Sequence, residues 1–334
     1  MSFRSHALSL ALLLSAMCPA QKNVPVNGPA DKSQVVAFTH ATVHASPGRT
    51  ITDGTVLVRY GRIIRMEQYG TPPPGAVVYD LHGLHLWPGL VEPYGDQGMP
   101  AAEGNAQQKP TGARFWNPAV HASTQAAKLY APDAEKAASL RAQGFTTVIA
   151  HRMDGIARGT SCAVLLAGRS ANEDIISPNA AAHFSFNKGS SKDPYPSSLM
   201  GSIALVRQAL YDARWYAVQG QREQNDADLQ ALNGQLDLPL VFEASDRSDV
   251  LRIASIGREF GLRFIVKGAG DEYARLGDVL ATGQPLIVPL VLPEAYDVED
   301  PFEALEVSLA KLKHWELAPT NPARIAEALS LIHI

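Results

Sequence analysis

Residues 238–266 read LPLVFEASDRSDVLRIASIGREFGLRFIV, and this stretch decides the fold. It begins with a short apolar run, 238–242, and continues with apolar or small residues at 250, 253, 254 and 257, the i, i+3, i+4, i+7 spacing of a helix over about 248–260. Gly261 supplies the left-handed residue that often ends a helix, and 262–266 is a second strand. Strand, helix and strand in this order predict a parallel βαβ unit.

The same plan recurs on both sides of this stretch. Downstream, a helix is expected over 272–281 and a strand over 286–290, while upstream a helix over 133–143 precedes a strand over 145–150. Strand centres near 241, 264 and 288 recur at the interval of a βα unit, and such units form either an open sheet or a closed barrel. A further helix is expected over 200–219, a long loop over 184–196, and a mobile polar insertion over 219–237.

The segment 35–88 has a different pattern. Short β-type runs at 35–38, 55–58, 63–64, 77–79 and 84–87 are separated by turn residues such as those at 46–48, 53–54 and 60–61. Intervals this short suit antiparallel hairpins, so a small β-sheet module is expected here.

Both ends of the chain carry special features. Residues 1–20 combine a positive start, an apolar run too short to span a bilayer and small residues before position 21, which predicts a signal peptide cleaved after Ala20 and a periplasmic or secreted protein. A lipoprotein anchor at Cys18 is the alternative. Residues 329–334 match the product of a sequencing adapter, and we expect this tail to be an artefact of a truncated chain.

Composition excludes several classes of partner. The 334 residues are 46% hydrophobic and 19% charged, with a net charge of -4 and no basic run, so no nucleic acid is expected as a partner. No membrane contact is expected after signal cleavage. Cys162 is the one cysteine that remains beyond the signal, and a lone cysteine is expected in the core.

Two runs, VLVRYGRII at 56–64 and VYDLHGLHLWPGLV at 78–91, resemble the entry to the amidohydrolase superfamily, in particular members similar to imidazolonepropionase. The resemblance implies a β-sandwich module, here 35–88, followed by a TIM-like (β/α)8 barrel, here 89–328, whose first strand follows Pro88-Gly89. The strands expected near 90, 147, 164, 241, 264 and 288 are fewer than the eight of a closed barrel, so an incomplete barrel is expected. We therefore interpret the chain as an N-terminal fragment that is aggregation-prone or marginally stable by itself.

The resemblance also shows what is missing. Active members carry a His-x-His motif after Pro-Gly that binds zinc or a similar divalent metal, and this chain has Tyr94 and Asp96 at those positions. Two later histidines of the family correspond to Glu243 and Lys267. A phenol with a pKa near 10 and one carboxylate are a poor replacement for imidazoles, so no metal and no other cofactor are expected here.

Side chains at the carboxyl ends of barrel strands line the functional mouth, which gathers Glu92, His151, Asp154, Glu243 and Lys267. Two hypotheses follow. In the first, the fragment is catalytically inactive and is a binding or structural half of a longer exported protein, with the missing C-terminal half as partner and a small polar ligand possible. In the second, Glu243, His151 and Asp96 form an unusual metal site that hydrolyses non-peptide C–N bonds of the cyclic amide type.

Overall fold

The computed structural model describes residues 34–102, 117–219, 225–290, 292–297 and 299–329. Contacts divide the chain into two compact units, one ending at Pro88 and the other beginning at Gly89. The expected signal peptide and residues 330–334 of the expected artefact tail lie outside the described residues. None of the described helices has the length and apolar character needed to cross a membrane.

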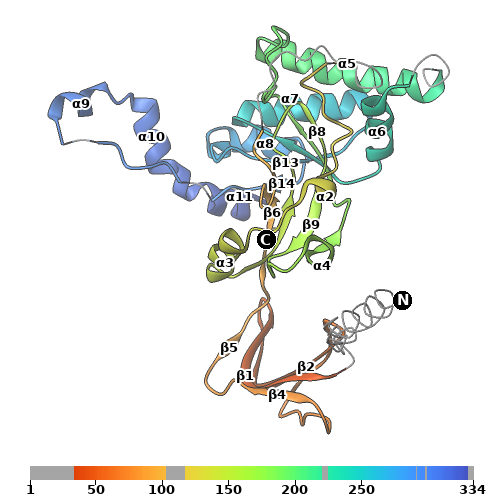
Figure 1. Cartoon of the computed structure of the whole chain (residues 1–334). Coiled ribbons are helices and arrows are strands. Elements are labelled where there is room, and N and C mark those ends of the chain that lie inside the picture. Colours follow the sequence, from red (N-terminus) through yellow and green to blue (C-terminus); the bar gives the residue numbers. More distant parts are fainter. Residues whose placement is uncertain (1–33, 103–116, 220–224, 291, 298, 330–334) are drawn as a thin grey trace, which may run out of the picture. The chain divides into compact units, whose positions relative to one another are not determined.

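The first unit is a single sheet (Figure 1). Its strands are β1 (Val36–Ser46), β2 (Arg49–Arg59), β3 (Arg62–Gln68), β4 (Val77–Asp80) and β5 (His85–Leu86). The expected hairpins are confirmed for β1–β2 and β2–β3, which pair antiparallel. Residues 53–54 were expected to be a turn but lie inside β2, where the register against β1 shifts; a Cβ on Gly54 would lie 2.7 Å from Val43 Cγ2.

The expectation of hairpins fails for the last two strands of this unit. Both β4 and β5 pair parallel with β1. Because β3 already runs in the direction of β1, residues 69–76 carry the chain back across the sheet before β4 begins, and this segment contains three consecutive prolines. Proline lacks the N–H of a regular strand pair, so the segment is a crossing loop.

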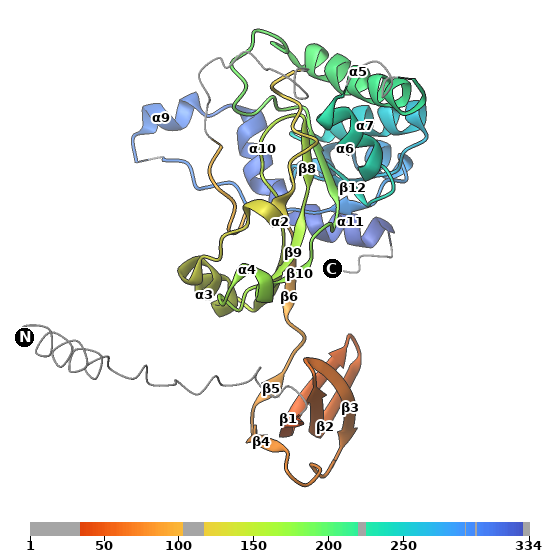
Figure 2. The same ribbon diagram turned by 45° about the vertical axis from the view of Figure 1, so that its right-hand side comes forward.

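The second unit is mixed α/β and its described strands form two open sheets (Figure 2). The first has the order β10-β9-β7-β6 and consists of β6 (Leu90–Gly95), β7 (Phe145–Ala150), β9 (Cys162–Leu165) and β10 (Ile175–Ser177). The second has the order β14-β13-β12-β11-β8 and consists of β8 (Ala157–Thr160), β11 (Ala182–Ser185), β12 (Leu240–Glu243), β13 (Phe264–Lys267) and β14 (Leu286–Ile287).

The expected parallel βα rhythm is confirmed from β12 to β14, which run parallel in chain order, and for β6–β7. β11 was not expected: it pairs parallel with β12, and its last two residues fall at the start of the loop expected over 184–196. The strand expected near 164 is present as β9 but runs antiparallel to β7, so it is not part of that rhythm. It follows β7 and β8 without a crossover helix of a dozen residues, which a parallel connection needs.

The described helices of this unit are α2 (Ala126–Leu129), α3 (Ala134–Ala142), α4 (Ala171–Asp174), α5 (Leu199–Val218), α6 (Ala227–Gln235), α7 (Arg247–Phe260), the 3-10 helix η3 (Glu272–Arg275), α8 (Leu276–Ala281), α9 (Pro301–Glu306), α10 (Leu309–Leu317), the 3-10 helix η4 (Ala318–Thr320) and α11 (Asn321–Leu329). The expected helix over 248–260 is confirmed as α7: Asp246 caps its first turn by accepting from the N–H groups of Ser248 and Asp249, and Gly261 ends it with φ 66°.

The mobile insertion expected over 219–237 is wrong where the structure describes it. Residues 227–235 form α6, whose Leu229 and Leu232 are buried in the main core. The segment is polar because only one narrow stripe of this helix faces inward. Apart from residues 220–224, which are not described, the segment is part of the packed fold.

The main core lies between the five-stranded sheet of the second unit and helices α5, α6 and α7. Leu240, Phe242, Phe264 and Val266 point from β12 and β13 toward these helices, where they meet Leu205, Leu210, Leu232 and Ile253. Cys162 is fully buried in a separate cluster, as expected, and burial raises the pKa of its thiol to about 11. An inert thiol of this kind is a packing residue.

Candidate functional site

Alternation along the parallel strands decides which side chains reach the site. Since Leu240 and Phe242 face the helices, Val241 and Glu243 face the opposite side of β12. The strand register places Ser185, Glu243 and Lys267 side by side at the carboxyl ends of β11, β12 and β13. Two of the residues expected at the mouth, Glu243 and Lys267, are therefore neighbours.

A buried arginine from β8, Arg158, joins Glu243 at the strand ends to Tyr94 of β6. The Arg158 guanidinium donates to Glu243 Oε2 at 2.8 Å through Nη2, to Tyr94 Oη at 2.7 Å through Nη1 and to the Gly155 carbonyl at 3.1 Å through Nε. Lys267 Nζ lies 3.7 Å from Glu243 Oε1 and 5.6 Å from the centre of the Tyr94 ring. We call Tyr94, Arg158, Glu243 and Lys267 the strand-end network.

The strand-end network carries two cationic side chains and one carboxylate. Arg158 is 4% exposed and Glu243 is 24% exposed, so their pair is largely shielded from water. Burial raises the pKa of the Tyr94 hydroxyl well above its ordinary value, an effect that outweighs the opposing influence of Arg158. Tyr94 therefore stays a neutral phenol, and the network has an excess of positive charge.

Two buried histidines, His151 and His183, lie beside the network, and His183 is two residues before Ser185 on β11. His183 is in register with Val241, and its ring stacks on that of His151 with centroids 3.7 Å apart and an angle of 14° between the planes. Both side chains are fully buried, and none of their four ring nitrogens has a hydrogen-bond partner within the described part of the chain. Burial, reinforced by Arg158, lowers the pKa of His151 to about 3, and burial also lowers the pKa of His183 well below its ordinary value.

The other residues expected at the mouth have local roles. Glu92 Oε1 accepts from the N–H of Tyr94, at 3.1 Å. Asp154 is buried and accepts from the N–H and hydroxyl of Ser190, at 2.7 and 2.9 Å, which anchors the loop after β11. Asp96 is exposed beyond the end of β6. Of the residues expected at the mouth, Glu243, Lys267 and His151 lie near the Tyr94 side chain, whereas Glu92 contacts only the Tyr94 backbone.

Sequence reasoning missed Arg158 and His183. Arg158 lies in a run of small residues, 155–161, that has no obvious strand pattern, and His183 precedes the segment expected to be a loop. The available signal for Arg158 was a single arginine in an otherwise uncharged run followed by strand-like residues at 162–166. Its partners, 64 and 85 residues away in sequence, gave no local sign.

The donor set does not fit a catalytic metal ion. Among the described residues, no group of three or more His, Cys, Asp or Glu side chains is arranged to hold one. The lone pairs of an imidazole lie in the ring plane, so the stacked rings of His151 and His183 do not converge on one ion. The Glu243 carboxylate is already paired with Arg158 and Lys267, and these cations repel a divalent metal.

Comparisons with known proteins identify a solved structure of similar fold. A scan of the sequence against protein-family models finds no match. No curated protein matches the sequence either. Among solved structures, an amidohydrolase from Thermotoga maritima is similar over 85% of this chain and 76% of its own chain, with a TM-score of 0.64 and 20% identity.

Two further solved structures are less similar. A prolidase complexed with N-methylphosphonate-L-proline matches over 89% of this chain and 76% of its own, with a TM-score of 0.42 and 14% identity. An N-acyl-D-glutamate deacylase from Bordetella bronchiseptica, complexed with zinc and a phosphonate inhibitor, matches over 76% and 58%, with a TM-score of 0.33 and 15% identity. The similarity to the Thermotoga maritima structure confirms the amidohydrolase resemblance at the level of the fold.

Proposed function

We propose that this chain, which has the fold of an amidohydrolase, does not perform metal-dependent hydrolysis through its strand-end site and instead is a binding or structural part of an exported protein. Fold by itself does not determine function, so the proposal depends on the chemistry of the site. In this proposal the second unit corresponds to part of a (β/α)8 barrel and the first to a β-sandwich module.

The observation that carries the proposal is the pairing of Arg158 with Glu243. In the positions where the resemblance implies metal-binding histidines, this chain has Tyr94, Glu243 and Lys267, and Arg158 joins them. A permanently charged guanidinium satisfies the carboxylate and the phenol. The cation that organises the strand ends is therefore a side chain of the protein.

The alternative is a metal-dependent hydrolase that uses Glu243, His151 and Asp96. Its support is that carboxylates and imidazole are competent ligands. The arrangement opposes it, because His151 is fully buried and stacked on His183 while Asp96 is exposed beyond β6. We therefore favour the non-hydrolytic function.

Metal content distinguishes the two. The chain and its variants Glu243→Ala and Asp278→Ala are purified from zinc-supplemented medium, dialysed without chelator and analysed for zinc per polypeptide. Asp278→Ala is the control, because Asp278 is a surface carboxylate that pairs with Arg275. We expect substoichiometric zinc that is the same in all three samples. Stoichiometric zinc that is lost in Glu243→Ala and retained in the control would establish the hydrolase alternative.

Export is a separate part of the proposal. It is supported by the charged start and apolar run of residues 1–20. Mass spectrometry of the N-terminal peptide after expression with the native leader tests it. A mature chain that begins near Gln21 is expected, and an intact N-terminus in the cytoplasm would contradict export.

A further inference from the structure

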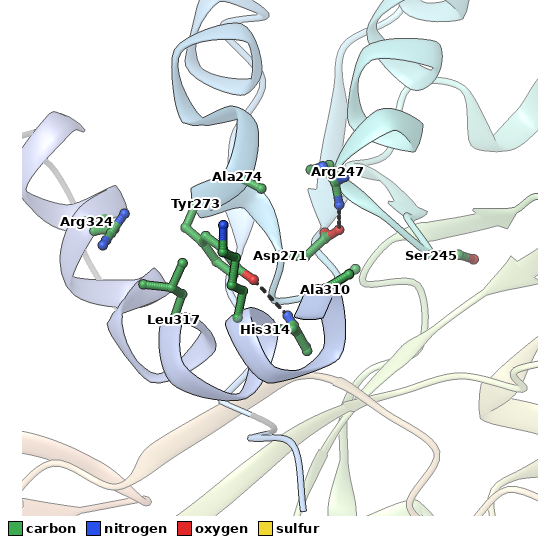
Figure 3. A pocket seen from close by; sticks show the side chains of 11 residues that line it. Ser245, Arg247, Asp271, Tyr273, Ala274, Ala310, His314, Leu317 and Arg324 are labelled. Carbon is green, nitrogen blue, oxygen red and sulfur yellow. Dashed lines mark hydrogen bonds and ion pairs between the residues drawn. The ribbon is translucent and has the colours of Figure 1, made fainter. Parts of the chain in front are cut away.

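A second polar site lies beside the strand-end network, where the chain that follows β12 and β13 meets α10 and α11. It is a pocket of about 550 Å³ (Figure 3). Ser245 and Arg247 come from the segment after β12, Ala269 and Asp271 from the segment after β13, and Lys313 from α10. Proteins with parallel α/β sheets commonly bind ligands just beyond the carboxyl ends of the strands.

The wall of the pocket is held by specific contacts. Tyr273 Oη and His314 Nδ1 are 3.0 Å apart, which ties η3 to α10, and the Tyr273 N–H donates to Asn321 Oδ1 at 2.8 Å, which ties η3 to α11. Asn321 in turn donates to the buried Glu272. Segments about 40 to 50 residues apart in sequence are thus fixed around one pocket.

The charges that line the pocket are unbalanced. Arg247, Lys313 and Arg324 contribute three positive charges, and Asp271 contributes one negative charge. Arg247 Nη1 pairs with Asp271 Oδ2 at 2.6 Å, whereas Lys313 and Arg324 form no ion pair with any described carboxylate. The pocket therefore has a net positive charge, which favours an anion.

Two buried polar atoms of this ion pair have no partner within the described residues. They are Arg247 Nε, a donor, and Asp271 Oδ1, an acceptor. Both atoms are closed to solvent while Arg247 and Asp271 pair with each other, and buried polar groups are nearly always hydrogen-bonded in folded proteins. A ligand that offers an acceptor and a donor would satisfy both when this ion pair shifts to receive it. A simple anion would satisfy only the first.

From this pairing of charge with unsatisfied atoms, we propose that the pocket binds a small carboxylate or phosphate that also carries a hydroxyl or amino donor. The anionic group binds Arg247, Lys313 and Arg324, and the donor binds Asp271. This deepens the function proposed above, since it names the ligand class of a non-hydrolytic chain. The two remain separable because zinc content tests the first and ligand titration tests the second.

Titration of the full chain with four probes tests the proposal, by calorimetry or by ligand-observed NMR. L-Lactate has the carboxylate and the hydroxyl, propionate lacks the hydroxyl, L-lactamide lacks the charge, and glycerol 3-phosphate replaces the carboxylate. We expect lactate or glycerol 3-phosphate to bind, and this choice identifies the anionic group. The affinity for lactate should be about fivefold higher than that for propionate, because lactate adds one hydrogen bond. Lactamide should not bind.

Variants locate the binding. Lys313→Gln and Arg324→Gln should each weaken binding of the best probe about tenfold, as expected for the loss of a charge-assisted contact. Lys311→Gln, on the same helix α10 but outside the pocket, is the matched control and should bind as the unmodified chain does. The proposal is overturned if neither anionic hydroxy compound binds, if lactamide binds as well as lactate, or if Lys313→Gln and Lys311→Gln behave alike.

Discussion

Arg158 and Glu243 lie 85 residues apart in sequence and join in a pair 2.8 Å long at the carboxyl end of β12. Arg158 is the more buried partner, so removal of Glu243 leaves a cation that water reaches poorly. We expect Glu243→Gln to lower the free energy of unfolding by about 2 kcal/mol, less than the roughly 3–5 kcal/mol of a fully buried pair. Denaturant unfolding followed by circular dichroism measures this loss.

The exposed pair of Arg275 and Asp278 supplies the control for that measurement. Asp278→Asn removes a carboxylate that is about half exposed, and surface pairs contribute roughly 0–1 kcal/mol. Equal effects of Glu243→Gln and Asp278→Asn would show that the strand-end network is not a structural element.

The stacked histidines predict a pH dependence of stability. His151 has a pKa of about 3 in the folded chain against an ordinary 6.5, and the pKa of His183 is lowered as well. The unfolded chain therefore binds protons that the folded chain does not, and stability that is complete above pH 6.5 is lost as the pH falls toward 3. Both histidines therefore contribute to the loss of stability as the pH falls.

The variant His183→Phe keeps an aromatic ring for the stack and removes one titrating group. We expect the free energy of unfolding to fall less steeply between pH 6 and pH 4 in this variant than in the unmodified chain. Trp215→Phe, which exchanges one partly exposed aromatic ring of α5 for another, removes no titrating group and should leave the slope as it was. An unchanged slope in His183→Phe would contradict the assignment.

Much of the second unit could be predicted because its pattern is local. The helix α7 shows its apolar spacing, its cap at Asp246 and its stop at Gly261 within one stretch, and β12 and β13 flank it as apolar runs. Period-two alternation then also places Glu243 and Lys267 on one face at the strand ends. Those two residues of the candidate site were predictable for this reason.

The rest of the site could not be predicted in this way. Arg158 is positioned by β8, which pairs antiparallel with β11, and short strands of small residues have no distinctive period. His183 is buried against His151 and Tyr94, contacts that only the folded chain brings together. Local patterns predict elements, whereas this site depends on pairs distant in sequence.

A substitution at Gly261 tests how the end of α7 contributes to stability. Its φ of 66° lies in the left-handed region, and no atom lies within 4 Å of the place a Cβ would take, so the effect of an added methyl group is backbone strain alone. Gly261→Ala should destabilise the chain by about 1 kcal/mol. Gly277→Ala, within α8 and equally unobstructed, should instead stabilise it by about 0.5 kcal/mol. Thermal denaturation of both variants checks the opposite signs.

The last prediction concerns the free edges of the sheets in the second unit. Among the described strands β6 is the end strand of its sheet, and its Leu90 and Val91 are about half exposed. Unpaired apolar strand edges recruit other chains, so residues 21–334 expressed alone should associate as the concentration rises.

Val91→Lys should reduce this association, because a charged lysine on an edge strand opposes pairing. Val218→Lys, a control at the exposed end of α5, should not reduce it. Light scattering during size-exclusion chromatography at several concentrations measures the effect. A monomer at all concentrations with a cooperative melt above about 60 °C would contradict the prediction, because such a chain has no exposed edge that limits its stability.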